Sequence, residues 1–345
     1  MQNLMSNWLA DLSLARKFAL IGAVAALMLA LPSALVVGAN LELMRSAQSQ
    51  LAGVAPAKAA MELLRQTQQH RGLANVVLGG GAGGDAARQT TRTEVDRALT
   101  LLQASIGELT GSTLSTGVEP MAAQWRTLAA AVDGKSITAA QSFEQHTALI
   151  AQQLKLIQDI THASGFVLTR DPGAYFVQNA VLGHLPRLTE ALGQARGLGA
   201  GLLARGEATP AQRARVGALA TRAGDTFNDM RKSLELAMRD DATVRPAVAE
   251  LLRAATEATE SALKAVDQRV VRADTLDFAA TAYFAVTTSA IDAQFKLVGA
   301  ASELLVTMLR AEVAQARQQL AAVLGGSAAL ALLALWVMWS VTRVT

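Results

Sequence analysis

The chain has 345 residues, of which 51% are hydrophobic, 4% aromatic and 17% charged. It contains no cysteine, which excludes disulfides, thiol catalysis and cysteine-ligated metal sites. Lys and Arg number 31 against 28 Asp and Glu, and this net charge of +3 gives no indication of nucleic-acid binding.

The first predicted element is a membrane span. Residues 1–17 end in Arg16-Lys17, and no charge follows from Phe18 to Ala39. A helix over 18–41 would cross the hydrocarbon core, and the two basic residues place the N-terminus 1–17 in the cytoplasm. A cleaved signal peptide ending at Ala39 is the alternative, but the apolar run is longer than a signal peptide needs.

A second span is expected near the other end. Residues 320–341 hold 22 positions without a charge, and 342–345 would begin a cytoplasmic linker. Two spans put residues 42–319 on the far side of the membrane, which in a two-membrane bacterium is the periplasm. The prediction is a protein of the inner membrane whose central domain is periplasmic.

The central region shows heptad-like spacing and no convincing alternation of period two, so we expect an elongated all-α bundle. The first helix runs on from the span to Leu78. Three further helices are expected over 85–109, from just after Pro120 to Val132, and from Thr138 to Thr169. Others should begin at Asp171, cover 210–240, begin at Thr243, and run from Leu276 into the second span.

An internal repeat indicates that the bundle has two modules. Residues 63–91 align with 188–216 at a constant offset of 125, without a gap. The nine identities are Leu63/Leu188, Gln69/Gln194, Arg71/Arg196, Gly72/Gly197, Leu73/Leu198, Leu78/Leu203, Gly81/Gly206, Ala86/Ala211 and Arg88/Arg213. We interpret them as two related helix-turn-helix pieces, one in each module.

The repeated arginines are the candidate functional residues. Arg71 lies where an otherwise apolar helix face turns polar, so its charge needs a partner. One interpretation is a structural ion pair with an Asp or Glu of the bundle. The other is that Arg71, with Arg196, Arg92 or Arg213, receives a small anion, because guanidinium binds planar oxyanions with two donors.

Other patterns carry little chemistry. The glycine run 79–84 lacks the Lys-Ser/Thr ending of a phosphate loop, and the four histidines have no metal-binding spacing, so we expect no metal and no cofactor. Neither a nucleophile elbow, a paired-carboxylate motif nor a dinucleotide fingerprint is present, so we expect no enzyme. The glycines at 193, 197 and 201 predict close helix packing and, as the alternative, room for a ligand.

Several segments resemble bacterial sensors. The opening LSLARKFALIGA, followed by a span, resembles the start of methyl-accepting chemotaxis proteins. LLRQTQQHRGLANVVLGG and TRTEVDRALTLL resemble the first helices of nitrate- and nitrite-sensing domains, with the form LQxERGLS…QRxxTDxAL. His70 replaces the Glu of that form, and Arg92 and Asp96 stand near its QRxxTD positions. Arg71 matches the Arg of its ERG, and the resemblance carries over only Arg71 as a residue that would hold the anion. LPRLTEALGQARGLGAGLLARGEATPAQR and AYFAVTTSAIDAQFKLV resemble the periplasmic regions of long helical chemoreceptors.

The resemblance implies the sensory input region of a transmembrane chemoreceptor. Such a region would bind a small, anionic periplasmic ligand, form a homodimer in the bilayer and pass a signal through its last helix. The HAMP linker and signalling hairpin of that family are absent from the sequence, so cytoplasmic partners are expected only if an output domain exists. The alternative is a membrane-anchored helical interaction or structural protein that senses nothing.

Overall fold

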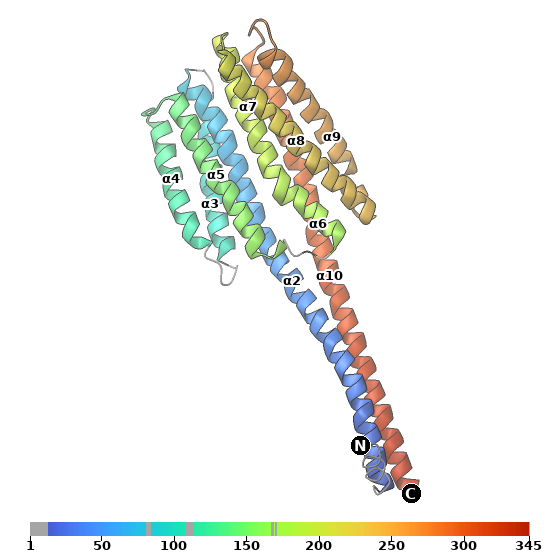
Figure 1. Ribbon diagram of the computed structural model, residues 1–345. Coiled ribbons are helices and arrows are strands. Elements are labelled where there is room, and N and C mark those ends of the chain that lie inside the picture. Colours follow the sequence, from blue (N-terminus) through green and yellow to red (C-terminus); the bar gives the residue numbers. More distant parts are fainter. Residues whose placement is uncertain (1–12, 81–83, 108–113, 167–168, 170, 345) are drawn as a thin grey trace, which may run out of the picture. The chain divides into compact units, whose positions relative to one another are not determined.

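The protein is described by a computed structural model that covers residues 13–80, 84–107, 114–166, 169 and 171–344. None of these residues forms a β-strand, and the predicted all-α fold is confirmed (Figure 1). The elements are α2 (Leu14–Leu78), α3 (Asp85–Ile106), α4 (Ser115–Asp133), α5 (Ala139–Ala163), α6 (Pro172–Gln178), η2 (Asn179–His184), α7 (Leu185–Arg205), α8 (Pro210–Asp240), α9 (Val244–Val266), η3 (Asp267–Val271) and α10 (Ala280–Val344).

Helix starts follow the capping residues that the sequence shows. Thr138 and Thr209 each form a capping box with the glutamine three residues later, and the Asp171 side chain accepts a hydrogen bond from the amide of Ala174. Gly206 ends α7 with a φ of 72°, the left-handed conformation that glycine adopts most easily. These boundaries were predictable because each depends on a few neighbouring residues.

Three boundaries differ from the sequence prediction. Helix α4 begins at Ser115 and runs through Pro120, because a proline near the start of a helix costs few backbone hydrogen bonds. Helix α5 ends at Ala163 rather than Thr169, since Gly165 turns the chain with a φ of 72°. Helix α10 begins at Ala280 rather than Leu276. The predicted end of the second helix, residue 109, lies outside the described residues.

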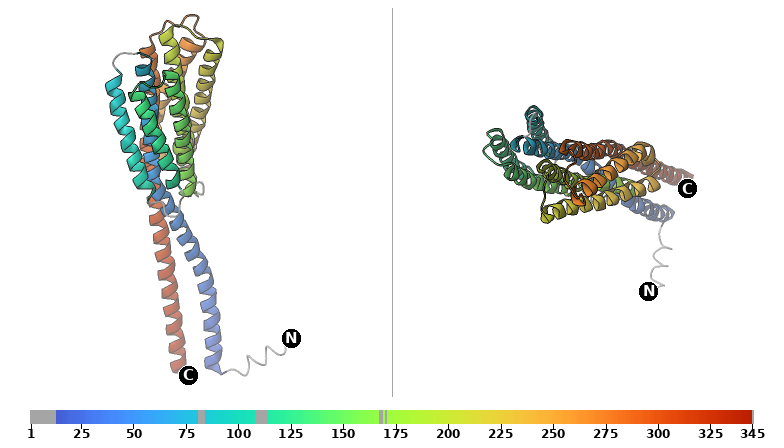
Figure 2. Two further views of the ribbon diagram at one scale, coloured as in Figure 1. Left: turned by 90° about the vertical axis from the view of Figure 1, so that its left-hand side faces the viewer. Right: turned by 90° about the horizontal axis from the view of Figure 1, so that it is seen from above.

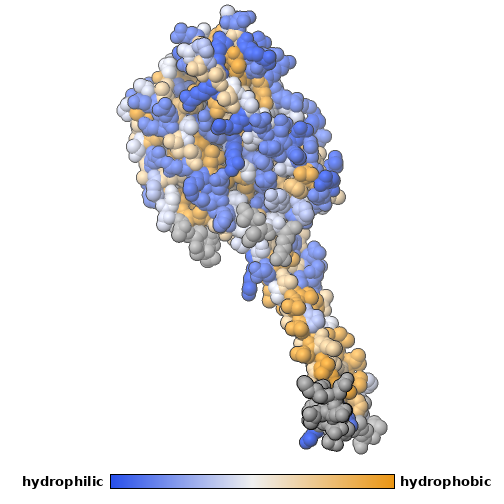
Figure 3. All heavy atoms as spheres, in the orientation of Figure 1, coloured by the Kyte–Doolittle hydropathy of each residue, from blue (hydrophilic) through white to orange (hydrophobic). Residues whose placement is uncertain are grey.

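The chain forms two compact units, residues 1–48 with 310–345 and residues 49–309. In the first, α2 and α10 pair antiparallel: the hydroxyls of Ser33 and Ser327 lie 2.9 Å apart, and Gly22 lies against Met338. Hydrophobic residues dominate the surface of this pair, such as Leu31 and Leu332 with 63% and 67% exposure (Figure 3). Both helices are long and apolar enough to cross a membrane.

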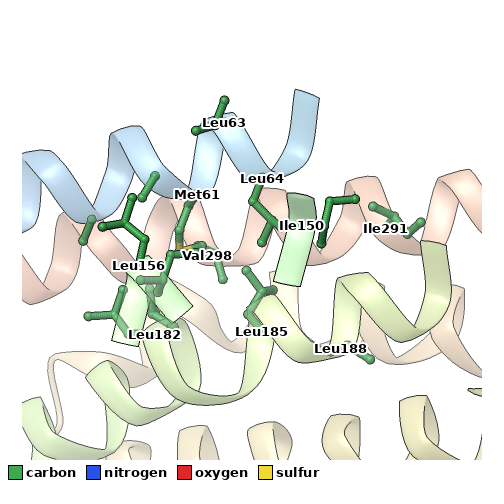
Figure 4. Packing of buried hydrophobic residues seen from close by; sticks show 14 of the residues in the cluster. Met61, Leu63, Leu64, Ile150, Leu156, Leu182, Leu185, Leu188, Ile291 and Val298 are labelled. Carbon is green, nitrogen blue, oxygen red and sulfur yellow. The ribbon is translucent and has the colours of Figure 1, made fainter. Parts of the chain in front are cut away.

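The second unit, 49–309, is a helical bundle around a leucine-rich core. Residues from α2, α5, α7, η2 and α10 interdigitate there, among them Met61, Leu64, Ile150, Leu182, Leu185, Leu188, Ile291 and Val298 (Figure 4). Helices α2 and α10 lie side by side within it (Figure 2), and Lys58 of α2 forms an ion pair with Glu303 of α10. Helices α2 and α10 therefore both belong to the core of the bundle.

Two features of the bundle had no sequence signal. The segments η2 and η3 are π-helical, which inserts one extra residue per turn and often marks functional positions. Gly199 of α7 also touches α10 closely, since a Cβ there would clash with the hydroxyl of Tyr283. The Tyr283 hydroxyl donates to the carbonyl of Ala195 at 2.9 Å, which fixes α10 against α7.

Candidate functional site

Arg71 lies fully buried in the bundle and is held by an acidic residue 119 positions away. Its Nη1 and Nη2 atoms donate to the two carboxylate oxygens of Glu190 on α7, at 2.7 and 3.1 Å. Nη1 also donates to the Thr147 hydroxyl at 3.0 Å, and the guanidinium lies 5.0 Å from the centre of the Phe143 ring. This two-pronged geometry gives strong, charge-assisted hydrogen bonds.

The carboxylate of Glu190 is surrounded by further donors. The amide groups of Gln68 and Gln194 donate to its two oxygens at 3.0 and 2.7 Å. Four hydrogen bonds therefore compensate the burial of this anion, which otherwise would cost several kcal/mol. Of the two interpretations of Arg71, the structure contains the structural ion pair.

Arg196 lies on α7 near Arg71 but has a different environment. Its Nη1 donates to the Thr288 hydroxyl at 2.9 Å, its Nη2 to the carbonyl of Gln68 at 3.5 Å, and its guanidinium lies 4.7 Å from the Phe284 ring centre. Among the described residues no carboxylate accepts a hydrogen bond from it, and its buried Nε has no partner. Burial, and then the charge of Arg71, lower the pKa of Arg196 to about 10.

The two arginines occupy equivalent positions in the internal repeat. Each lies over a phenylalanine and donates to the threonine that follows this phenylalanine by four residues. The partners of Arg71 are Phe143 and Thr147 on α5, and those of Arg196 are Phe284 and Thr288 on α10. The glycine after each arginine contacts the other phenylalanine, since a Cβ at Gly197 would lie 2.8 Å from Phe143 and one at Gly72 would lie 3.3 Å from Phe284. The bundle thus contains the same arrangement twice. We call the two arrangements cradles: the first holds Arg71 with Phe143 and Thr147, and the second holds Arg196 with Phe284 and Thr288.

One residue breaks this symmetry. The offset of 125 places Arg65 at the position in α2 that Glu190 has in α7. Arg71 therefore has an internal carboxylate, whereas the equivalent position beside Arg196 carries a second cation. Arg65, Glu190 and the repeated Phe-x-x-x-Thr pattern were not among the predicted features, although the aligned repeat contains the first two.

A pocket of about 160 Å³ lies beside Arg196. Its walls come from α2, α7 and α10 and consist of Arg65, Gln68, Gln69, Leu73, Arg196, Phe284, Thr288, Ile291 and Asp292. At about 30 Å³ per water, the space holds a small oxyanion together with a few waters. Two guanidinium groups, those of Arg196 and Arg65, face one carboxylate of the lining, that of Asp292, and Arg65 also pairs with Glu62 outside the pocket.

The other two predicted arginines lie elsewhere and have partners. Arg92 and Arg88 of α3 both pair with Asp133 at the end of α4. Arg213 of α8 donates to the carbonyls of Val270 and Ala273, at 2.8 and 2.6 Å, and so caps the end of η3. The structure brings Arg71 and Arg196 together and places Arg92 and Arg213 at the ends of other helices.

The glycines at 193 and 197 leave room for the cradle side chains. A Cβ at Gly193 would lie 3.0 Å from Nη2 of Arg71, and the Cβ at Gly197 would come even closer to Phe143. The close helix packing that the sequence predicted here thus serves the buried arginine.

A buried histidine pair lies near the first cradle. Nδ1 of His146 donates to the carbonyl of Ser142 at 2.7 Å, so its Nε2 is the acceptor for Nδ1 of His70 at 2.8 Å. Burial and the neighbouring charge of His146 lower the pKa of His70 to about 2, and burial lowers that of His146 to about 4. Both rings are neutral in the folded protein at neutral pH.

The pair makes the stability of the bundle depend on pH. Below pH about 6.5 the unfolded chain binds protons that the folded histidines do not, so stability is lost as the pH falls, by about 1.4 kcal/mol per pH unit for each histidine. We expect thermal unfolding of the full chain in detergent to show this slope between pH 6 and 5. His162→Gln, at an exposed position on α5, should keep the slope. A slope that persists after His70→Gln and His146→Gln together would contradict this origin.

Residues 62–306, which include both cradles, match the family model described as nitrate and nitrite sensing. Among solved structures, the chain is similar to that of the NasR transcription antiterminator, with a TM-score of 0.62 and 20% identity over 84% of this chain and 81% of that chain. At that identity the similarity concerns the fold alone. No curated protein sequence matches the chain.

Proposed function

Because the chain belongs to the nitrate and nitrite sensing family, we propose that its bundle is the input region of a membrane-anchored sensor and that nitrate or nitrite binds at Arg196. The observation that carries the proposal is the unequal pair of cradles. Arg71 is neutralised by Glu190, whereas Arg196 faces a pocket and, among the described residues, no carboxylate accepts a hydrogen bond from it. A bound oxyanion would take the place that the Glu190 carboxylate has in the other cradle.

The pocket offers donors that suit a planar oxyanion. The guanidinium of Arg196, whose Nε has no partner, supplies charged donors, and Arg65, which also pairs with Glu62, adds a second guanidinium. Gln69 aligns with Gln194, whose amide donates to Glu190 in the other cradle. A nitrate ion in the pocket would thus receive the same kinds of hydrogen bond that Glu190 receives.

The route of the signal is also part of the proposal. Thr288 and Phe284, which hold Arg196, lie on α10, and the same helix continues through the apolar segment 320–341. An anion that binds one packing of α10 more tightly than another would shift the population between them. We place the bundle in the periplasm, the two apolar segments in the inner membrane and a second copy of the chain alongside. The output would be that of a chemoreceptor, because the opening residues resemble that class.

Binding of nitrate to variants of the full chain in lipid nanodiscs tests the proposal. Arg196→Gln is expected to weaken nitrate binding about 10- to 100-fold, because it removes charge-assisted hydrogen bonds worth about 1.5–3 kcal/mol. Arg187→Gln, at an exposed position on the same helix, is the matched control and should bind as the wild type does. Isothermal titration measures both, with sulfate as the comparison anion.

A second variant separates loss of binding from loss of folding. Arg65→Glu places a carboxylate at the position equivalent to Glu190, so we expect a stable protein that no longer binds nitrate. Arg65→Gln should bind weakly but measurably. If neither nitrate nor nitrite binds the wild type, or if Arg65→Glu binds as well as the wild type, the anion site is refuted and a non-sensing anchored protein becomes the better description.

A further inference from the structure

A second, apolar pocket lies in the bundle between α2, η2 and α10. Its volume is about 150 Å³, and its walls are Val54, Ala57, Met61, Phe166, Val181, Leu182, Phe295, Val298 and Leu305, with Ser302 among them. The charged residues Lys58, Glu62 and Arg65 lie at its rim. We propose that this pocket binds an uncharged, single-ring compound with a hydroxyl group, as a ligand distinct from the oxyanion.

The size and lining of the pocket set the class of ligand. A cavity of about 150 Å³ lined by aliphatic and aromatic residues holds one benzene ring. The Phe166 and Phe295 side chains provide aromatic walls for edge or face contacts with such a ring. A larger molecule would have to extend past the rim into solvent.

Gly299 indicates that the space is kept open. It lies within the long helix α10 and lines the pocket, and a Cβ built on it would meet nothing within 4 Å. Glycine is, after proline, the least favourable residue in the interior of a helix. Gly299 is exposed, so the helix carries an unfavourable residue at the open side of the pocket, beside a space that its own side chains do not fill.

The charges at the rim indicate an uncharged ligand. Lys58 pairs with Glu303, and Arg65 pairs with Glu62 at 3.4 Å, so cations and anions are balanced around the mouth. Ser302 is 7% exposed and supplies a hydroxyl inside the apolar lining. A ring with one hydroxyl can pair with Ser302 and leave the ion pairs intact.

The segment η2 forms one wall of the pocket. Val181 and Leu182 reach the pocket from the π-helical segment, whose wider turn changes the direction of the side chains that follow it. The pocket is thus hollowed from three elements rather than being a flat face of one helix. That shape favours a small molecule over a second copy of the chain as the occupant.

Titration of phenol into the full chain in nanodiscs tests the inference. We expect saturable phenol binding to the wild type, at least about tenfold weaker binding to Gly299→Leu, and unchanged binding to Gly326→Leu. Gly326 is the matched control, since it also lies in α10 with nothing within 4 Å of an added Cβ but does not line the pocket. Ser302→Ala should weaken phenol binding and leave benzene binding unchanged. This variant tests the inference even if Gly299→Leu does not fold.

Three results would overturn the inference. Phenol uptake that rises linearly without saturation would show partition into lipid only. Equal binding to Gly299→Leu and the wild type would place the ligand elsewhere. Loss of a dimer in Gly299→Leu by sedimentation, without saturable phenol binding to the wild type, would assign this face to a second copy. Nitrate binding is not a readout here, so the test stands or fails separately from the oxyanion site.

Discussion

Replacing Glu190 with glutamine is expected to lower the free energy of unfolding by about 3–5 kcal/mol, because it leaves the Arg71 guanidinium buried without a counter-charge. The side-chain exposures of the pair are only 1% for Arg71 and 9% for Glu190, so water cannot replace the lost partner. Gln68 and Gln194 would then donate to a neutral amide, which adds to the cost. Urea unfolding of the full chain in detergent, followed by circular dichroism, measures the change.

An exposed ion pair provides the control for this variant. Glu235 pairs with Arg231 one turn away on α8, with side-chain exposures of 50% and 44%, so Glu235→Gln should cost less than about 1 kcal/mol. Nitrate should also stabilise Glu190→Gln more than it stabilises the wild type, since the first cradle then lacks its own carboxylate. A loss below about 1 kcal/mol in Glu190→Gln would mean that the Arg71 pair is not buried as described.

Replacing Trp125 with alanine is expected to cost about 3–5 kcal/mol as well, for a reason of volume rather than charge. Trp125 is 1% exposed in the core beside α3 and α5. Its indole nitrogen donates to Asp96 at 2.7 Å, and its ring meets the edge of His70 with 4.9 Å between centres. Removal leaves a cavity, an acceptor without its donor and a less protected histidine pair.

Two further variants separate these contributions. Trp125→Phe keeps much of the volume and loses the hydrogen bond, so it should cost about 1–3 kcal/mol. Leu101→Ala on α3, where the side chain is 52% exposed, should change stability by less than about 0.5 kcal/mol. Thermal unfolding of the three variants in detergent would show this order. A Trp125→Ala variant as stable as Leu101→Ala would contradict the described core.

The sequence by itself determined the features that depend on nearby residues. The capping residues Thr138, Asp171 and Thr209 fixed three helix starts because a cap bonds to an amide only three residues away. The two uncharged segments and the internal repeat were visible for the same reason, since composition and a constant offset require no knowledge of packing. The arginines of the repeat were therefore identifiable as candidates.

Only the tertiary structure decided what each arginine does. Glu190 meets Arg71 across 119 positions, and His70 meets His146 across 76, because the helices pack in one particular register. A shift of one turn would give Arg71 a different partner, and no local pattern encodes that choice. The same packing leaves Arg196 over Phe284 beside a pocket. The difference between a structural arginine and a candidate ligand-binding one thus depends on which side chain the opposite helix presents.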